Sequence, residues 1–255
     1  MESNQKSNPE NNGLMASAEA IRKSGRVLYA FSSFYLPLYG LEIDFMFGRY
    51  DVFGYLSAVI YEIDEHVEAG SSPQSASGQL DKLAASLADK ILIDTQVASL
   101  FEDAKEYYRF EHEVLRGHRY DLSDVMATAE RRSFDFRLMH RALAQLTPGR
   151  YDEQLFAWLR KFEIRMEVED DILSFDEDMR RGTFNAACLA VKVAGDSANQ
   201  VVEEYRQVLE RGIEAGLSEL GAIQQERCRL VLSRYRGIVP RPETPRPPHF
   251  RPEHL

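Results

Sequence analysis

The stretch 155–175 is apolar on two opposite faces when it is read as an α-helix. At about 100° per residue, its apolar side chains separate into two groups. One face holds Leu155, Leu159, Phe162, Met166 and Leu173, and the other holds Ile164, Val168 and Phe175. A helix that is apolar on both sides has to be packed from both sides. The stretch therefore predicts a helix that runs through the middle of a bundle.

The chain between residues 16 and 238 follows a helical pattern almost throughout, with few alternating β-branched runs and no Asn-Gly or Asp-Gly hairpin signal. We therefore expect a single all-α domain over 16–238. Its helices should break where Gly, Pro or a cap-forming Ser or Asp interrupts the pattern. These predicted breaks are SSFYLPLYG, AGSSPQSASG, RGHRYDLSD, LTPGRYD, RRGTF and VAGDSA.

The two ends of the chain differ from this helical region. Residues 1–15 are rich in Asn, Ser and Glu, which predicts a flexible segment. The stretch IVPRPETPRPPHFRPEHL holds six of the ten prolines, and proline forbids a continuous helix. Residues 239–255 are therefore expected to form an extended Pro-rich tail, which is either disordered or a strap across the domain.

Composition excludes several classes of protein. The net charge of -10 argues against nucleic-acid binding, which requires an excess of Lys and Arg on at least one face. Cys188 and Cys228 are too few for a disulfide framework, so they suit a reducing compartment and are expected to be buried and unreactive. No secretory signal and no apolar run of membrane-spanning length is present. We expect a cytoplasmic protein without a transmembrane segment.

The stretch EVEDDILSFDED places oxygen-bearing side chains along one helix face. Asp170, Ser174 and Asp178 follow one another at i, i+4 and i+8, a spacing that brings side chains on neighbouring turns together. Such oxygens can share a hard cation such as Mg²⁺. Without a cation, the two carboxylates repel each other and their pKa values rise in a partly dry pocket. The alternative interpretation is an acidic, solvated helix end.

A second acidic site is predicted at the end of FGYLSAVIYEIDEHVEAG. Asp64 and Glu68 share one helix face, and they cap a column of aromatic and apolar side chains. The column consists of Phe53, Ser57, Ile60 and Tyr61. The alternative is an ordinary polar last turn, but the helix dipole favours cations at that end. A bound metal would reverse this preference.

The residues DDILSFDEDMRRG resemble the second metal motif of class I terpene synthases, in the isoprenoid synthase superfamily. The matching positions are Asp170, Asp171, Ile172, Ser174, Arg181 and Gly182. Asp178 departs from the pattern, because the family usually has Glu there. The resemblance implies an α-helical bundle around a central active-site cavity, with one Mg²⁺ held by Asp170, Ser174 and Asp178.

DEHVE, residues 64–68, is similar to the aspartate-rich DDxxD motif of the same family. Asp64 keeps the first position, whereas Glu65 and Glu68 stand where the family has aspartates. The motif lies upstream of the second motif and follows an aromatic helix, as the resemblance requires. It implies that Asp64 and Glu68 also bind metal.

Two further stretches resemble diphosphate-binding elements of the family. AERRSFDFRLMH offers Arg132 as the arginine that senses diphosphate ahead of a helix break, with Asp135 three residues on. Arg131 and Arg137 remain alternatives for this role. The alternative interpretation of Arg132 is an ordinary surface arginine in an acid-rich protein. Near the C-terminal end, LSRYRG resembles the Arg-Tyr pair that hydrogen-bonds diphosphate when the site closes, here Arg234 and Tyr235.

The resemblance implies a geranyl, farnesyl or geranylgeranyl diphosphate substrate and three Mg²⁺ ions, with Mn²⁺ as an alternative metal. Mg²⁺ with Arg132, Arg234 and Tyr235 can stabilise the charge that develops on the leaving diphosphate. The carbocation left behind needs a dry cavity with electron-rich walls. The candidate wall residues are Phe53, Ser57, Ile60, Tyr61 and Phe136.

Two rival functions remain open. One is a prenyl-coupling synthase of the squalene or phytoene type, although Ser174 occupies the first acidic position of that DxxxD motif. The other is a non-catalytic helical scaffold, which the departures at Glu68 and Asp178 keep open. A zinc enzyme is disfavoured, since the six histidines lack paired-ligand spacing. Homodimers are common in the isoprenoid synthase fold, so a homodimer and a monomer both remain open.

Overall fold

The computed structural model describes residues 15–147 and 152–238. Every regular element in these two ranges is a helix, as the all-α prediction requires. In chain order the elements are α1 (Ala18–Leu38), α2 (Ile43–Phe47), α3 (Tyr50–Glu68), α4 (Pro73–Leu87), α5 (Thr95–Leu115), α6 (Leu122–Arg132), α7 (Phe134–Leu146), α8 (Glu153–Arg181), α9 (Ala186–Ala194), the short 3-10 helix η1 (Gly195–Ser197), α10 (Ala198–Glu219) and α11 (Ala222–Ile238). None of these helices is both long enough and apolar enough to cross a bilayer.

Three predictions fall wholly or partly on residues outside the described ranges. The predicted flexible segment lies outside them except for Met15, and the predicted Pro-rich tail 239–255 lies outside them entirely. The predicted break at LTPGRYD is also outside them over residues 148–151. The fold that positions the candidate site is therefore described from α1 to α11.

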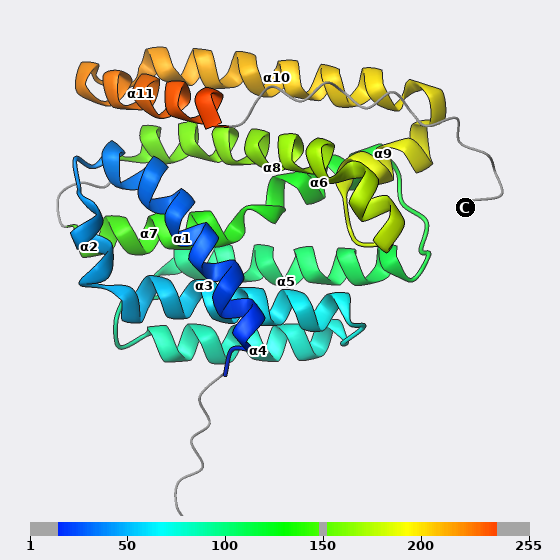
Figure 1. Ribbon diagram of the computed structural model, residues 1–255, viewed down its shortest axis with the longest axis horizontal. Coiled ribbons are helices and arrows are strands. Elements are labelled where there is room, and N and C mark those ends of the chain that lie inside the picture. Colours follow the sequence, from blue (N-terminus) through cyan, green and yellow to red (C-terminus); the bar gives the residue numbers. More distant parts are fainter. Residues whose placement is uncertain (1–14, 148–151, 239–255) are drawn as a thin grey trace, which may run out of the picture.

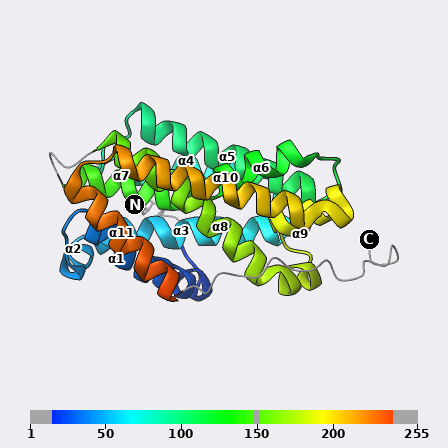
Figure 2. The ribbon, with the colours of Figure 1, turned by 90° about the horizontal axis from the view of Figure 1, so that it is seen from above.

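The long helices are stacked in layers, and α1 crosses them. Figure 1 shows α8 between α10, which lies above it, and α7, α5 and α3, which lie below it. α1 runs diagonally across the front of this stack, packed on α3 and on α11. From above, α11 and α1 lie side by side (Figure 2). The chain thereby surrounds α8 with other helices.

α8 is buried on two sides, as its apolar pattern predicts. Leu155, Leu159 and Phe162 belong to the main hydrophobic core. On the other side, Ile164, Val168 and Phe175 form a second cluster with side chains of α9 and α10. Leu173 departs from the prediction, because it is 53% exposed. A cavity, rather than a neighbouring helix, faces α8 at that level.

Aspartate N-caps and a glycine C-cap mark several helix ends. Asp121 begins α6 with a capping box, in which its carboxylate accepts from the Asp124 N–H and the Asp124 carboxylate accepts from the Asp121 N–H. Asp152 caps α8 by accepting from two backbone N–H groups. α8 ends at Gly182, whose φ of 69° is the left-handed conformation that favours glycine. The predicted break at RRGTF is therefore found at Gly182.

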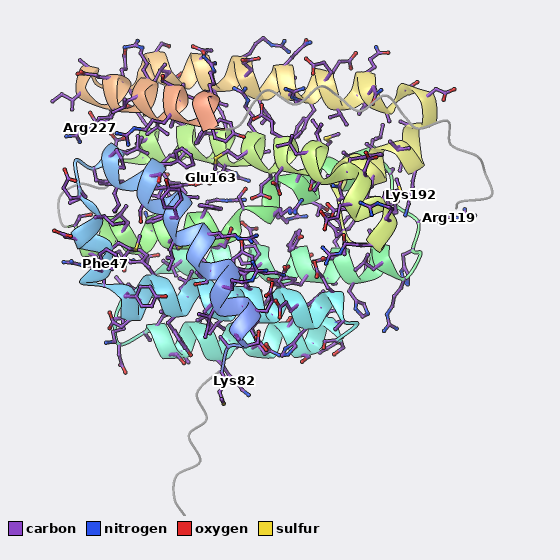
Figure 3. All side chains as sticks on the ribbon, in the orientation of Figure 1. Phe47, Lys82, Arg119, Glu163, Lys192 and Arg227 are labelled. Atoms are coloured by element: carbon purple, nitrogen blue, oxygen red, sulfur yellow. The ribbon has the colours of Figure 1, made fainter. Side chains whose placement is uncertain are left out.

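α1 is fastened near both of its ends. At its start, the Ser17 N–H donates to Glu62 Oε2 of α3 at 2.7 Å. At its end, Arg227 of α11 donates from Nη1 to the Leu38 carbonyl at 3.0 Å, and Figure 3 labels this arginine beside the end of α1. Gly40 has a φ of 64° there, and an added Cβ would lie 2.8 Å from the Arg227 guanidinium. The turn after α1 therefore needs glycine.

Candidate functional site

A cavity of about 470 Å³ lies among α1, α3, α8 and α11, with the junction of α6 and α7 on one side. Its wall consists of Tyr29, Ala30, Ser33, Phe34, Tyr61, Arg132, Phe136, Met166, Glu167, Asp170, Leu173 and Tyr235. Aromatic and apolar side chains supply most of this wall, while Arg132, Glu167 and Asp170 supply charge. Tyr29 and Leu173 are exposed and lie where the cavity opens to solvent. Its volume suits a small organic ligand.

Arg132 is the cationic group in this wall. α6 ends at Arg132, and Ser133 separates it from α7. The guanidinium Nε lies 3.2 Å from Glu167 Oε2, and Nη1 donates to Asp171 Oδ1. Both carboxylates belong to α8 and lie one turn apart. These contacts hold Arg132 against α8 beside Asp170.

Arg132 faces more carboxylates than it can neutralise. Burial raises the pKa of Glu167 to about 8, although the charge of Arg132 opposes this shift. Burial and then the charge of Glu68 raise the pKa of Asp64 to about 7, again opposed by Arg132. Asp170 is exposed at the cavity, and its pKa is raised mainly because the surrounding protein atoms displace water from its carboxylate. Carboxylates from α3 and α8 thus surround one guanidinium, and this excess negative charge would be offset by divalent cations.

The two halves of the predicted metal site lie in different surroundings. Asp64 is half-buried, Glu68 is exposed at the end of α3, and Asp170 lines the cavity. Their oxygens have the chemistry that Mg²⁺ prefers. In the described ranges, no group of three or more His, Cys, Asp or Glu side chains is arranged as a metal site. Sharing an ion therefore requires some of these side chains to turn.

Ser174 and Asp178 contact each other but do not line the cavity. Ser174 Oγ donates to Asp178 Oδ2 at 2.5 Å, and Asn185 Nδ2 donates to the same carboxylate oxygen at 2.9 Å. Thr183 Oγ1 donates to Asp178 Oδ1 at 3.1 Å. Asp178 is therefore satisfied by three protein donors, two of which come from the segment after α8. The sequence prediction did not include Asn185 or Thr183.

Arg234 and Tyr235 are both close to the cavity but have separate partners. Tyr235 lines the cavity, and its hydroxyl donates to Glu169 Oε2 at 2.6 Å. Arg234 is exposed, and its Nη1 lies 3.4 Å from the Ser33 carbonyl. Pro37 has no N–H for that carbonyl in the last turn of α1. Arg234 therefore contacts an oxygen that the proline leaves without its helical partner.

The predicted wall residues separate into two groups. Tyr61 and Phe136 line the cavity. Phe53, Ser57 and Ile60 are buried in the core and are not among the lining residues. Phe53 packs against Phe31 of α1, with ring centroids 5.6 Å apart. α1 covers this part of α3, so only the last turns of the predicted column reach the cavity.

The structure also distinguishes the three candidate arginines. Arg132 lines the cavity, whereas Arg131 does not. Arg137 is 2% exposed and donates to backbone carbonyls of Ser133 and Glu130. Of the three, only Arg132 is placed to meet a ligand in the cavity.

No family model, curated protein or solved structure matches the chain. The interpretation of the cavity therefore depends on its own residues.

Glu111 of α5 is an acidic neighbour of this site that the sequence prediction missed. It is 2% exposed, and its Oε2 has no hydrogen-bond partner among the described residues. Burial and then the charge of Asp64 raise its pKa well above the ordinary value. The signal in the sequence was a lone carboxylate on the apolar face of α5, beside Tyr107, Tyr108 and Val114.

Glu111→Gln is expected to stabilise the metal-free protein at pH 8. The raised pKa means that folded Glu111 keeps its proton to higher pH than the unfolded chain does. Its ionisation therefore lowers the free energy of unfolding as pH rises through the folded pKa. Removing a buried carboxylate whose Oε2 has no hydrogen-bond partner is worth about 2 kcal/mol, or roughly 6 °C in Tm for a chain of this size.

Thermal unfolding at pH 5 and pH 8 measures this effect. The matched control is Glu113→Gln, because Glu113 is partly exposed on the same helix and pairs with Arg109 at 2.9 Å. The control should change Tm by less than about 2 °C. An equal Tm for wild type and Glu111→Gln at both pH values would show that Glu111 carries no such charge penalty.

Proposed function

We propose that this chain is a Mg²⁺-dependent class I terpene synthase. It ionises a linear prenyl diphosphate, cyclises or rearranges the carbocation, and releases diphosphate. One observation carries the proposal: the wall of a single cavity combines Arg132 and Asp170 with the aromatic side chains of Phe34, Tyr61 and Phe136. The first two suit a metal-bound diphosphate, and the aromatic rings suit a carbocation.

The charged part of the cavity binds the diphosphate. Asp64, Glu68 and Asp170 are the residues that would hold Mg²⁺, which neutralises the diphosphate and stabilises the leaving oxygens. Arg132 donates to the diphosphate in exchange for one of its carboxylate partners, Glu167 or Asp171. This exchange is favourable because the cation compensates the carboxylate that Arg132 leaves.

Ser174 and Asp178 complete the second metal motif from outside the cavity wall. In the structure, the Ser174 hydroxyl and the Asn185 amide both donate to Asp178. Metal binding there requires Ser174 to turn its hydroxyl proton away from Asp178 and present a lone pair. Asn185 and Thr183 keep the carboxylate oriented while this happens.

The hydrocarbon part of the cavity folds and protects the prenyl chain. Phe34, Phe136 and Tyr61 line the cavity, and the electron-rich face of an aromatic ring lowers the energy of a carbocation without offering a basic nucleophile. Met166 adds a polarisable wall on α8. Water has to be excluded before ionisation. Tyr29 and Leu173 are the apolar side chains at the opening that a bound substrate would cover.

Product analysis tests this function. Purified protein with Mg²⁺ is incubated separately with geranyl, farnesyl and geranylgeranyl diphosphate, and the organic extract is analysed by gas chromatography with mass spectrometry. A cyclic or rearranged hydrocarbon or alcohol of unchanged carbon number supports the proposal and names the substrate. A product with the carbon number of two joined substrates would identify a prenyl-coupling synthase instead. Recovery of all three substrates would favour a non-catalytic scaffold.

A further inference from the structure

The break between α6 and α7 lacks the side-chain cap that usually stabilises a helix end. Ser133 is the residue between the two helices, and it makes no side-chain cap hydrogen bond. It is fully buried, and its Oγ has no partner within residues 15–147 and 152–238. Carbonyls in the last turn of a helix lose their intrahelical partners and need other donors when they are buried. The Ser133 carbonyl already accepts from the Arg137 backbone N–H at 3.2 Å, so the carbonyls in the last turn of α6 are the ones that need a donor from elsewhere.

Arg137 of α7 supplies that donor. Its Nε donates to the Ser133 carbonyl at 3.2 Å, and its Nη2 donates to the Glu130 carbonyl at 2.6 Å. A cation at the C-terminal end of α6 is also favoured by the helix dipole. Arg132 lies between the two carbonyls in sequence. The backbone that carries Arg132 is thus held on both sides by one side chain.

Two acidic residues of α8, one turn apart, pair with Arg137 and Arg132. Glu163 Oε2 lies 3.7 Å from Arg137 Nε, and Glu167 Oε2 lies 3.2 Å from Arg132 Nε. Glu163 also accepts a hydrogen bond from the Tyr35 hydroxyl of α1 at 2.5 Å. Figure 3 labels Glu163 just below α8, beside α1. Glu163, Tyr35 and Arg137 are all at most 2% exposed.

We infer that Arg137 is a positioning residue for Arg132, and that Glu163 with Tyr35 fixes Arg137 in that role. Lysine cannot replace it fully, since one ammonium on a flexible stem lacks the planar fork that reaches both carbonyls. The inference rests on the proposed function, in which Arg132 binds the diphosphate. The buried ion pair of Arg137 and Glu163 thereby has a role in diphosphate binding, although neither residue lines the cavity.

The test compares Arg137→Lys with Arg141→Lys. Arg141 is also a buried arginine on α7 and pairs with Asp94 at 3.1 Å, but it lies away from the break. Arg132→Met and the double variant Arg132→Met, Arg137→Lys complete the set. Two quantities are measured: kcat and KM with the preferred prenyl diphosphate, and calorimetric affinity for inorganic diphosphate with Mg²⁺. Circular dichroism and Tm report the fold.

Arg137→Lys is expected to lower kcat about 100-fold, the scale of loss for a displaced catalytic group. It should weaken diphosphate binding about tenfold, through the misdirected Arg132. Adding Arg137→Lys to Arg132→Met should weaken diphosphate binding no further, because both changes act through one side chain. Arg141→Lys should leave both quantities within about twofold of wild type even where it lowers Tm.

Two results would overturn the inference. One is an Arg137→Lys variant whose kcat and diphosphate affinity match those of Arg141→Lys. The other is full additivity in the double variant, which would mean that Arg137 acts independently of Arg132. If Arg137→Lys does not fold, Glu163→Gln takes its place in the same comparison. A wild-type protein that makes no product and binds no diphosphate would instead overturn the proposed function.

Discussion

Asp170→Asn is expected to lower kcat about 1000-fold or more while leaving helicity and Tm close to wild type. Asp170 is exposed and lines the cavity, so the fold does not depend on its packing. Its proposed role is to hold Mg²⁺, which supplies several kcal/mol of transition-state stabilisation. An amide keeps the shape of the side chain but loses the charge that binds the ion. The measurement is product formation at saturating substrate, with circular dichroism as the check on folding.

Asp176→Asn is the matched control for this prediction. Asp176 is exposed on the same helix and does not line the cavity. Its substitution should change kcat by less than about twofold, as expected for a solvated surface charge. For the first motif, Asp64→Asn should behave like Asp170→Asn. Full turnover by both variants would contradict the assignment of a metal site to Asp64 and Asp170.

Mg²⁺ together with inorganic diphosphate is expected to raise Tm by roughly 10 °C. A ligand that binds only the folded state at 1000 times its Kd stabilises it by about 4 kcal/mol, and each kcal/mol shifts Tm by about 2–4 °C at this size. The stabilisation arises because Mg²⁺ neutralises the carboxylates around Arg132, whose raised pKa values show that their charges are unfavourable. Thermal unfolding at pH 8 measures the shift directly.

Three controls separate this effect from general salt stabilisation. Mg²⁺ alone, diphosphate alone and sulfate at equal ionic strength should each raise Tm by less than the combination. Asp170→Asn should lose most of the shift, whereas Asp176→Asn should keep it. An unchanged Tm with Mg²⁺ and diphosphate together would favour the scaffold interpretation.

Periodicity was sufficient to predict the central helix. The two apolar faces of 155–175 became the two hydrophobic clusters on either side of α8. Asp64 and Asp170 both lie near enough to Arg132 for its charge to oppose the rise in their pKa values, but spacing along a single helix did not predict this shared neighbour. The prediction that Leu173 is buried was wrong, because periodicity identifies an apolar face but cannot distinguish a neighbouring helix from a cavity.

Buried polar groups could not be predicted in the same way. Glu163 lies at 0% exposure on a helix whose pattern gave no reason to bury a carboxylate. Its burial depends on Arg137 and Tyr35, which come from other helices and are remote in sequence. Pairing across helices is a property of the packed structure, and spacing along one helix carries no information about it.

Helix ends were predictable where a residue itself determines the backbone conformation. Gly182 ends α8 because glycine readily adopts a positive φ. Pro37 predicted a break, but it lies within the last turn of α1, where it interrupts little. The break at Ser133 has neither glycine nor proline, and only the family resemblance indicated a break in that region. Arg137, four residues after Ser133, donates to the carbonyls on both sides of Arg132 and maintains this break.

The contact between α1 and α11 has a consequence for how the molecule is made. Arg227 and the Leu38 carbonyl are 189 residues apart in sequence, yet they form a hydrogen bond. Phe34 and Tyr235, which share the cavity wall, meet edge to face with ring centroids 6.0 Å apart. During synthesis, α1 leaves the ribosome long before α11 exists. Closing so long a loop is slow, so the cavity wall between α1 and α11 is completed only after α11 has been synthesised.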